Sequence, residues 1–368
     1  MSEFLLEAFQ GVAQRDFPSR WSSDCMQHAQ QDALFRLAAL KQGRSRRLRE
    51  RLNGQRPSRI CLSANLGGFD CRVPGLEDLP VEVLEKGWFQ ASDPDLRRQR
   101  IEHLAGALVI VNNNDVGHDQ GMAAYGDFYS RCEQAVFVAW DWDNHHWLEL
   151  SSFLAAHSDI YAPAHQENLY LLSRYNPAIA GPVYCASVQW SRGFLADHLA
   201  DLLTAERSDA PLGKHIPYAP FGFRNRVVTT LGQHYPSIGF SDRSFHVRTP
   251  EERLAEWAAH KLHWIVPVLN DVPIRIFDAL ISGGIPVVPE SLRLLAPVRD
   301  LPREHVVFYG PQDVVDPREV VARGLALFNA GGRDGIATRH RLALEGHHGD
   351  QRVRQMADAA ADLFGLKV

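Results

Sequence analysis

The chain has 368 residues, of which 45% are hydrophobic and 23% are charged, so it is long enough for two globular domains of ordinary size. A net charge of −5 excludes a surface adapted as a whole to nucleic acid. No apolar run approaches the ~20 residues that span a bilayer. The first residues lack the basic start of a secretory signal, and the five cysteines have no CxxC spacing. A cytoplasmic protein with reduced thiols is therefore expected.

The first predicted segment is a helical extension over residues 1–56. Apolar residues recur at helical spacing after Asp24, which caps the helix. The helix continues into a group of five arginines: Arg44, Arg46, Arg47, Arg49 and Arg51. This Arg44–Arg51 segment is interpreted either as a solvated helix end or as a contact with an anionic partner. Such a partner would be the acceptor, an assembly complex or the inner face of a membrane.

From residue 59 the pattern changes to short apolar strands separated by helix-length intervals. These strands are predicted at residues 59–65, 107–114, 135–143, 159–164 and 182–188. Such spacing predicts a parallel sheet with helices on both faces, and hence a Rossmann-like domain over residues 57–205. Polar residues follow several of these strands, at the carboxyl ends where open α/β sheets bind ligands.

A polar stretch at residues 203–214, which contains Pro and Gly, predicts the boundary to a second Rossmann-like domain over residues 206–345. Its strand segments are expected at residues 215–223, 235–240, 263–270, 285–288 and 305–310, with one helix from about residue 225 and another after residue 273. Residues 346–368 are predicted to form a C-terminal helix that crosses back to the first domain. The expected fold class is therefore α/β, with two Rossmann-like domains, an N-terminal helical extension and a C-terminal helix.

The segment at residues 270–290, NDVPIRIFDALISGGIPVVPE, joins a polar turn to a short helix, two glycines and a buried strand. Pro273 suits the helix start, because its missing N–H is not needed there. Gly283 and Gly284 allow a sharp exit from the helix. A helix start whose backbone amides point outward beside Arg275 is an anion site.

Within this segment, RIFDALISGGIPVV resembles the nucleotide-sugar signature of two-domain GT-B glycosyltransferases, in its exostosin-like or family-1-type form. The resemblance implies that Arg275 contacts the donor phosphate and that Asp278 contacts the donor. Retaining members often carry a second acid eight residues earlier. Asn270 holds that position here, with Asp271 beside it, so the stereochemistry stays open. The alternative is an ordinary helix in which Arg275 pairs with Asp278 one turn away.

A second candidate for phosphate contact is FGFRNRVV, residues 221–228, where two arginines follow a glycine at a strand-to-helix turn. Side chains two positions apart diverge on a helix, so only one of Arg224 and Arg226 is expected to point inward. The alternative is a solvated helix start. The predicted donor-binding residues are, in full, Asn270, Asp271, Arg275, Asp278, Gly283, Gly284, Arg224 and Arg226.

The densest polar cluster is WDWDNHHW, residues 140–147, which follows an apolar strand. Asp143 is the first candidate for the base that takes the proton of an acceptor hydroxyl, with His145 or His146 as its partner or as the base itself. Asp141 completes the catalytic candidates. The triplet DWD also matches the DxD pattern that holds a divalent metal in the other major glycosyltransferase fold. A third interpretation is a polar turn between two aromatic residues.

The acceptor is expected to bind at two other places in the first domain. The polar loop at residues 112–119 follows a strand, and Glu167 lies near the positive end of a predicted helix. The candidate acceptor-binding residues are Asn113, Asn114, Asp115 and Glu167. No cofactor and no metal ligand is assigned, since a divalent metal is possible but not expected.

Together the resemblance and these residues imply transfer of a sugar from a nucleotide-sugar donor to a hydroxyl of a saccharide or lipid-linked saccharide. The pathway expected is synthesis of a bacterial-type surface polysaccharide, and nucleic acid is not an expected partner. Two alternatives stay open. One is a transferase for a CMP-linked acid sugar such as Kdo. The other is a catalytically silent protein that binds sugar nucleotides or acts as a scaffold.

Overall fold

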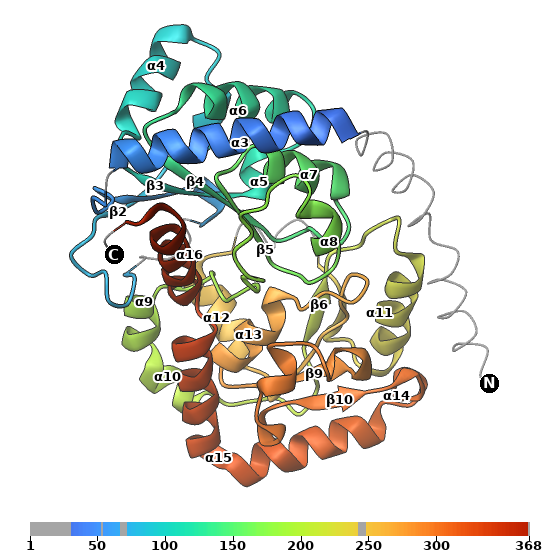
Figure 1. Ribbon diagram of the computed structural model, residues 1–368. Coiled ribbons are helices and arrows are strands. Elements are labelled where there is room, and N and C mark those ends of the chain that lie inside the picture. Colours follow the sequence, from blue (N-terminus) through green and yellow to red (C-terminus); the bar gives the residue numbers. More distant parts are fainter. Residues whose placement is uncertain (1–30, 53, 67–71, 242–247, 367–368) are drawn as a thin grey trace. The chain divides into compact units, whose positions relative to one another are not determined.

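The computed structural model describes residues 31–52, 54–66, 72–241 and 248–366, and these divide into two compact units (Figure 1). Among the described residues, the first unit contains 31–184 and 349–366, and the second contains 185–348. The predicted boundary at 205/206 falls inside the second unit. The reason is that α9 (Arg192–Asp197) and α10 (Leu199–Thr204) contribute Leu195 and Leu202 to the core of that unit.

The sheet of the first unit has five parallel strands in the order β2–β1–β3–β4–β5. Their bounds are β1 (Ile60–Leu62), β2 (Val81–Val83), β3 (Leu108–Asn112), β4 (Val136–Asp141) and β5 (Ile160–Pro163). Every residue of β1, β3, β4 and β5 is buried, as the apolar runs predicted. The edge strand β2 is short and partly exposed, and the sequence pattern did not predict it.

Helices cover both faces of this sheet. Their bounds are α3 (Gln31–Leu52), α4 (Pro94–His103), α5 (Asn113–Val116), α6 (Gln120–Arg131), α7 (Leu148–Ala156), α8 (Leu169–Leu172) and α16 (Gly349–Phe364), with 3-10 turns η1 (Ala64–Leu66) and η2 (Trp88–Gln90). In Figure 1, α6 and α7 lie on one face and α16 lies on the other. The predicted return of the C-terminal helix to the first unit is thus observed. None of the described helices is long and apolar enough to cross a membrane.

Helix α3 is joined to the sheet by a buried ion pair. Arg44 Nε donates to Asp159 Oδ1 at 2.5 Å, and Arg44 Nη2 donates to the Cys132 carbonyl at 2.9 Å. The Asp159 carboxylate also accepts from Tyr129 Oη at 3.0 Å and from the Phe137 backbone N–H at 2.8 Å. Arg44 is therefore an internal anchor rather than a surface charge. The predicted cap at Asp24 lies outside the described residues.

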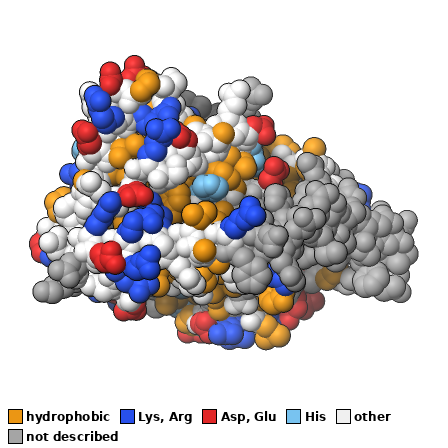
Figure 2. Space-filling view, turned by 45° about the horizontal axis from the view of Figure 1, so that its top comes forward, with side chains coloured by type: hydrophobic (Ala, Val, Ile, Leu, Met, Phe, Trp, Pro, Cys, Tyr) orange, Lys and Arg blue, Asp and Glu red, His pale blue; other side chains and the backbone are white. Residues whose placement is uncertain are grey.

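Two more of the five arginines are also used within the first unit. Arg47 and Arg51 both form ion pairs with Glu133, at 3.3 and 3.1 Å. In the described part of the face shown in Figure 2, basic and acidic side chains are interspersed rather than separated. Three of the five arginines thus have carboxylate partners within the first unit, Asp159 for Arg44 and Glu133 for Arg47 and Arg51.

The second unit repeats the strand order of the first. Its strands are β6 (Gly213–His215), β7 (Ile238–Phe240), β8 (Leu262–Trp264), β9 (Ile285–Pro289) and β10 (Val307–Tyr309), in parallel sets β10–β9–β8 and β6–β7. The Leu212 backbone joins the two sets, because its N–H donates to Leu262 O at 2.9 Å and its carbonyl accepts from Trp264 N at 2.7 Å. Both units are therefore Rossmann-like, as predicted, and the switch point of the second lies between β6 and β8.

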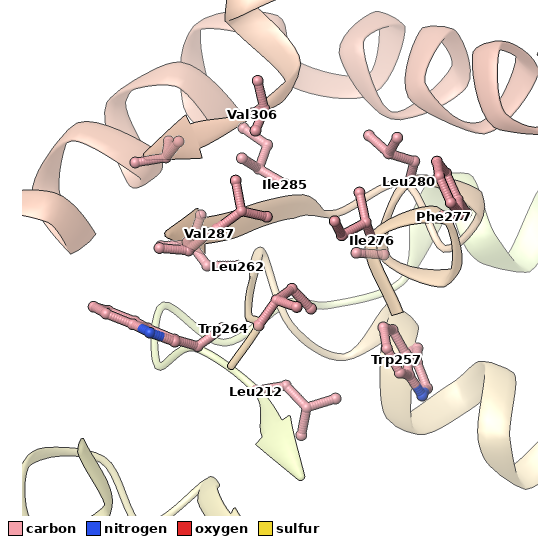
Figure 3. Packing of buried hydrophobic residues seen from close by; sticks show 14 of the residues in the cluster. Leu212, Trp257, Leu262, Trp264, Ile276, Phe277, Leu280, Ile285, Val287 and Val306 are labelled. Carbon is pink, nitrogen blue, oxygen red and sulfur yellow. The ribbon is translucent and has the colours of Figure 1, made fainter. Parts of the chain in front are cut away.

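The helices of the second unit pack around a core made largely of β-branched and aromatic side chains. Their bounds are α9, α10, α11 (Gly222–His234), α12 (Pro250–Ala258), α13 (Ile274–Ile281), α14 (Pro311–Val315) and α15 (Arg318–Gly346), with 3-10 turns η4 (Glu290–Leu292), η5 (Val298–Asp300) and η6 (Arg303–His305). Figure 3 shows Ile276, Phe277 and Leu280 of α13 gathered with Ile285 and Val287 of β9 in this core. The packing of these side chains holds α13 in place against the sheet, and with it the first turn that carries Arg275.

Two predicted elements differ in the structure. Residues 182–188 form no strand, because the Val183 N–H donates to Pro163 O within the first unit, whereas the Ser187 N–H donates to His347 O within the second. The segment contains the boundary between the units, so its two halves have different partners. The C-terminal helix predicted from residue 346 begins at Gly349, because α15 ends at Gly346 and the chain between them is held by His348, whose Nε2 lies 2.9 Å from the Trp190 carbonyl.

Candidate functional site

Basic side chains meet at the switch point of the second unit. Arg224, in the first turn of α11, is buried, and its guanidinium donates to Ile216 O at 2.8 Å and to Val266 O at 3.1 Å. Those carbonyls lie just beyond β6 and β8, so Arg224 holds the two strand exits together. Arg226 is exposed. The inward member of the predicted pair is thus Arg224, and it positions the backbone.

Arg275 lies in the first turn of α13 and is half-buried. It makes no hydrogen bond or ion pair with any residue that the structure describes. Burial lowers the pKa of Arg275 to about 10, and the charge of Arg224 adds to this effect, so the guanidinium stays charged at neutral pH. The N-cap residue of α13 is Pro273, whose side chain accepts no hydrogen bond from the first-turn amides. An unpaired cation beside uncapped helix amides favours an anion at this position.

The sequence pattern missed two residues of this site. His215 is fully buried at the end of β6, and burial, Arg275 and Arg224 hold its pKa well below the usual value, so the ring is neutral. The Tyr218 ring lies 5.5 Å from the Arg224 guanidinium carbon. Both belong to the letters HIPY, which the sequence analysis placed at the start of a strand, whereas β6 ends at His215. A predicted strand that ended at His215, as β6 does, would have placed both residues at the carboxyl edge of the sheet, where ligands bind.

The loop after β8 carries the predicted residues Asn270 and Asp271. Leu269 has φ +59°, a left-handed conformation that is costly for a residue with a branched side chain. Asp271 is buried, and its charge acts on both Arg224 and Arg275. The loop is therefore held in a strained form beside the cation of α13. Strain of this kind is concentrated at ligand-binding sites.

Asp278 lies on α13, one turn after Arg275. It is fully buried, and Gln189 Nε2 donates to its Oδ2. The structure shows no ion pair between Asp278 and Arg275 in the described chain, so the pairing considered as the alternative is not formed. Burial raises the pKa of Asp278 to about 7.

This raised pKa makes stability depend on pH. Because the folded chain holds the Asp278 proton more tightly than the unfolded chain, stability is lost as the pH rises from about 4 to about 7. Asp278→Asn has no such loss. We therefore expect the variant to gain a few kcal/mol relative to wild type between pH 4 and pH 8, at about 1.4 kcal/mol per pKa unit. Urea unfolding at several pH values measures this. Asp300→Asn, at an exposed site, is the control, and a constant difference between Asp278→Asn and wild type would contradict the assignment.

Gly283 and Gly284 have a packing role. A Cβ atom at Gly283, where φ is +76°, would lie 2.4 Å from the Ile336 side chain, and one at Gly284 would lie 2.4 Å from the His263 ring. Both glycines follow the carboxyl end of α13, whereas Arg275 is in its first turn. The structure thus places both glycines at the opposite end of α13 from Arg275, where close packing accounts for them, and their donor contact stays a prediction.

In the first unit, Asp141 ends β4 with its side chain turned inward. It is buried, its Oδ2 accepts from Tyr161 Oη at 2.6 Å, and its Oδ1 accepts from the Asp143 N–H at 3.0 Å. Burial raises its pKa. Asp141 therefore supports the turn. The DxD arrangement, with both carboxylates facing one metal, is not formed.

Asp143 and the two histidines of the turn do come together. Asn113 Nδ2 donates to Asp143 Oδ2 at 2.6 Å, and His146 Nε2 lies 4.0 Å from Asp143 Oδ1. His145 Nε2 and His146 Nδ1 are 2.9 Å apart. Burial, with the charge of Asp141 second, raises the pKa of Asp143 to about 6. Burial also lowers the pKa of His146 to about 4, so the imidazoles are neutral.

Asn144 and His165 complete this cluster and were not predicted. The Asn144 side-chain amide donates to the carbonyls of His165 and Glu167, at 2.9 and 2.8 Å, and accepts from the His165 N–H at 2.9 Å. The His165 and His145 rings are 4.4 Å apart between centroids. The loop after β5 is thereby fixed against the loop after β4. Burial raises the pKa of the half-buried Glu167.

The remaining acceptor candidates separate into different roles. Asp115 accepts from Ser63 Oγ at 2.5 Å and from the Asn65 backbone and side chain at 3.0 to 3.1 Å, which closes the switch point between β1 and β3. Asn114 is exposed on α5. Only Asn113 of the loop joins the Asp143 cluster.

No family model matches the chain, and no curated protein matches it. Among solved structures, it is similar to a sucrose-phosphate synthase from Thermosynechococcus elongatus (TM-score 0.47, 12% identity, 84% of this chain and 99% of that one). It is also similar to a UDP-forming alpha,alpha-trehalose-phosphate synthase from Burkholderia vietnamiensis (TM-score 0.42, 12% identity, 84% and 99%). A third is the spinosyn forosaminyltransferase SpnP (TM-score 0.35, 12% identity, 84% and 99%). Similarity at this level does not identify a function.

Proposed function

We propose that this protein is a glycosyltransferase that binds a nucleotide-sugar donor in the second unit. One observation supports this above the others. The half-buried cation of Arg275 and the uncapped start of α13 lie at the switch point between β6 and β8, where Rossmann-like sheets bind nucleotides. The letters RIFDALISGGIPVV supply the signature resemblance at the same helix.

A diphosphate suits this site chemically. Its charge requires cations and backbone N–H groups that are already in place when the leaving group departs. Arg275 can bind two phosphate oxygens at once, and the first-turn amides of α13 can bind others. Arg224 fixes the strand exits on which this arrangement depends. The donor phosphates therefore need no metal ion.

The acceptor base is proposed in the first unit. A sugar hydroxyl is a poor nucleophile at neutral pH, so a positioned base is needed. Asp143 has its Oδ2 held by Asn113, and its Oδ1 lies on the side of His146. The side chain retains 24% exposure, so it remains accessible to a substrate. The acceptor proposed is a saccharide or lipid-linked saccharide of a bacterial-type surface polysaccharide.

Arg275→Ala tests the donor site. We expect nucleotide-sugar binding to weaken by roughly 1.5–3 kcal/mol, the value for a lost charge-assisted hydrogen bond. Isothermal titration calorimetry measures the affinity. Arg226→Ala is the matched control, since it removes an exposed arginine from the neighbouring helix start. If Arg275→Ala binds the donor like wild type while its melting temperature is unchanged, the phosphate site lies elsewhere.

A thermal-shift screen with UDP-, GDP-, dTDP- and CMP-sugars identifies the donor class. Stabilisation by a CMP-linked acid sugar alone would favour the Kdo-type transferase, in which basic residues face a sugar carboxylate. Donor binding without transfer to any saccharide acceptor would favour a silent binding or scaffold protein. Stabilisation by none of the four would contradict the proposed function.

A further inference from the structure

The turn after β4 brings three metal-binding side chains together within one unit. The carboxylate of Asp143 and one ring nitrogen each of His145 and His146 lie within 4.8 Å of one another. Ligands of a tetrahedral zinc ion, each 2.0–2.1 Å from the metal, are about 3.3 Å apart. His145 Nε2 lies 2.9 Å from His146 Nδ1, whereas the other nitrogen of the same ring, His146 Nε2, lies 4.0 Å from Asp143 Oδ1. An ion takes only one nitrogen of His146, so the rings must turn to bring one set of donor atoms to this spacing, starting from atoms that already lie within 4.8 Å. Small side-chain rotations would therefore close the set around an ion.

We propose that Asp143, His145 and His146 bind one divalent transition-metal ion. Two imidazoles and a carboxylate suit zinc, cobalt or manganese, whereas magnesium prefers oxygen ligands alone. Three protein ligands leave at least one coordination position for a water or a substrate oxygen. This set differs from the DxD pair considered from the sequence, because Asp141 is turned inward and only Asp143 is shared.

A supporting shell of hydrogen bonds holds the three ligands. The Asp143 carbonyl accepts from the N–H groups of His146 and Trp147, both at 3.0 Å, which closes the turn. Asn113 orients the Asp143 carboxylate from one side, and so leaves the other oxygen toward His146. Outer-shell partners of this kind fix the orientation of metal ligands.

A second observation concerns the buried His145 ring. His145 is 3% exposed, and its Nδ1 has no hydrogen-bond partner in the described structure. A buried polar atom without a partner costs free energy. The other nitrogen of this ring, Nε2, faces His146 Nδ1. A turn of the His145 side chain can therefore present the unpartnered nitrogen to an ion bound by Asp143 and His146.

The inference goes beyond the proposed function, since metal binding needs no nucleotide sugar. It also gives Asp143 a second role in activating the acceptor hydroxyl. A metal-bound hydroxyl has a lowered pKa, so the ion would activate an acceptor oxygen. In that case Asp143 would act as a ligand and not as the base itself.

The test is titration of the full-length, metal-free protein with Co²⁺. Visible absorption reports coordination, and calorimetry with Zn²⁺ gives the stoichiometry. We expect one ion per chain, at least tenfold weaker binding in His146→Ala and in Asp143→Asn, and little effect of Mg²⁺ as a competitor. The control is His118→Ala, which removes an exposed histidine whose ring contacts Trp147.

Two outcomes would overturn the proposal. One is no Co²⁺ absorption band with the wild-type chain. The other is equal Co²⁺ affinity in wild type, His146→Ala and Asp143→Asn, which would place any bound ion elsewhere. Asp143→Asn preserves the shape of the side chain, so it remains informative even if His146→Ala does not fold. Because the readout does not depend on the donor, failure of the metal site and failure of the transferase proposal are separable.

Discussion

Asp143→Asn is expected to lower turnover by about 10²–10⁴-fold, the contribution of a positioned general base. The asparagine amide keeps the size of the carboxylate but can neither take the hydroxyl proton nor bind a metal well. Donor affinity should stay unchanged, because the proposed phosphate contacts belong to the second unit. Steady-state kinetics, with the donor and acceptor found by screening, and calorimetry of donor binding measure the two quantities.

The control for this prediction is Glu149→Gln, an exposed carboxylate in the first turn of α7. It removes a charge six positions away without entering the cluster, so its turnover should remain near that of wild type. His146→Gln extends the test to the neighbouring imidazole. If Asp143→Asn and His146→Gln both retain turnover within severalfold of wild type, the cluster is structural, and the base would be sought near Glu167.

Arg44→Met is expected to destabilise the first unit by about 3–5 kcal/mol, the cost of leaving one partner of a buried ion pair uncompensated. Asp159 is 5% exposed and would lose its ion pair with Arg44, while Tyr129 Oη and the Phe137 N–H would remain as hydrogen-bond donors. Chemical denaturation followed by circular dichroism measures the loss. The methionine fills much of the same volume, so the effect reports charge and hydrogen bonds more than packing.

Arg49→Met, at an exposed position on the same helix, is the matched control and should stay within about 0.5 kcal/mol of wild type. Asp159→Asn combined with Arg44→Met should recover part of the loss, because the buried charge is then removed together with its partner. Equal stability of Arg44→Met and Arg49→Met would show that the anchor contributes little.

The strands could be predicted because their signal is local. The buried runs around Val109 and Phe137 are uniformly apolar, which is the pattern of interior parallel strands. Helix geometry predicted that only one of Arg224 and Arg226 points inward, but the structure was needed to show that it is Arg224. The start of α13 was likewise visible, since proline, arginine and the following apolar residues lie within one short segment.

The rest depends on contacts between residues that are distant in the chain. Arg44 meets Asp159 across 115 positions, so its charge could not be distinguished from that of its solvated neighbours. Asn144 was not singled out from the sequence, yet its side chain fixes the loop after β5. The partner of Asp278 is Gln189, 89 positions earlier, rather than Arg275 one turn away. Side-chain partners of this kind are set by the packing of the sheet.

The return of α16 to the first unit has a consequence for the order in which the protein is made. The first unit needs residues 349–366, and these leave the ribosome only after the whole of the second unit has been synthesised. Domains often fold as they emerge, beginning with the N-terminal one. In this chain the second unit is fully synthesised before the first one. Its two ends are joined by a hydrogen bond from the Ser187 N–H to the His347 carbonyl, at 3.0 Å. Residues 185–348 can thus fold as a complete unit while the first unit still lacks α16.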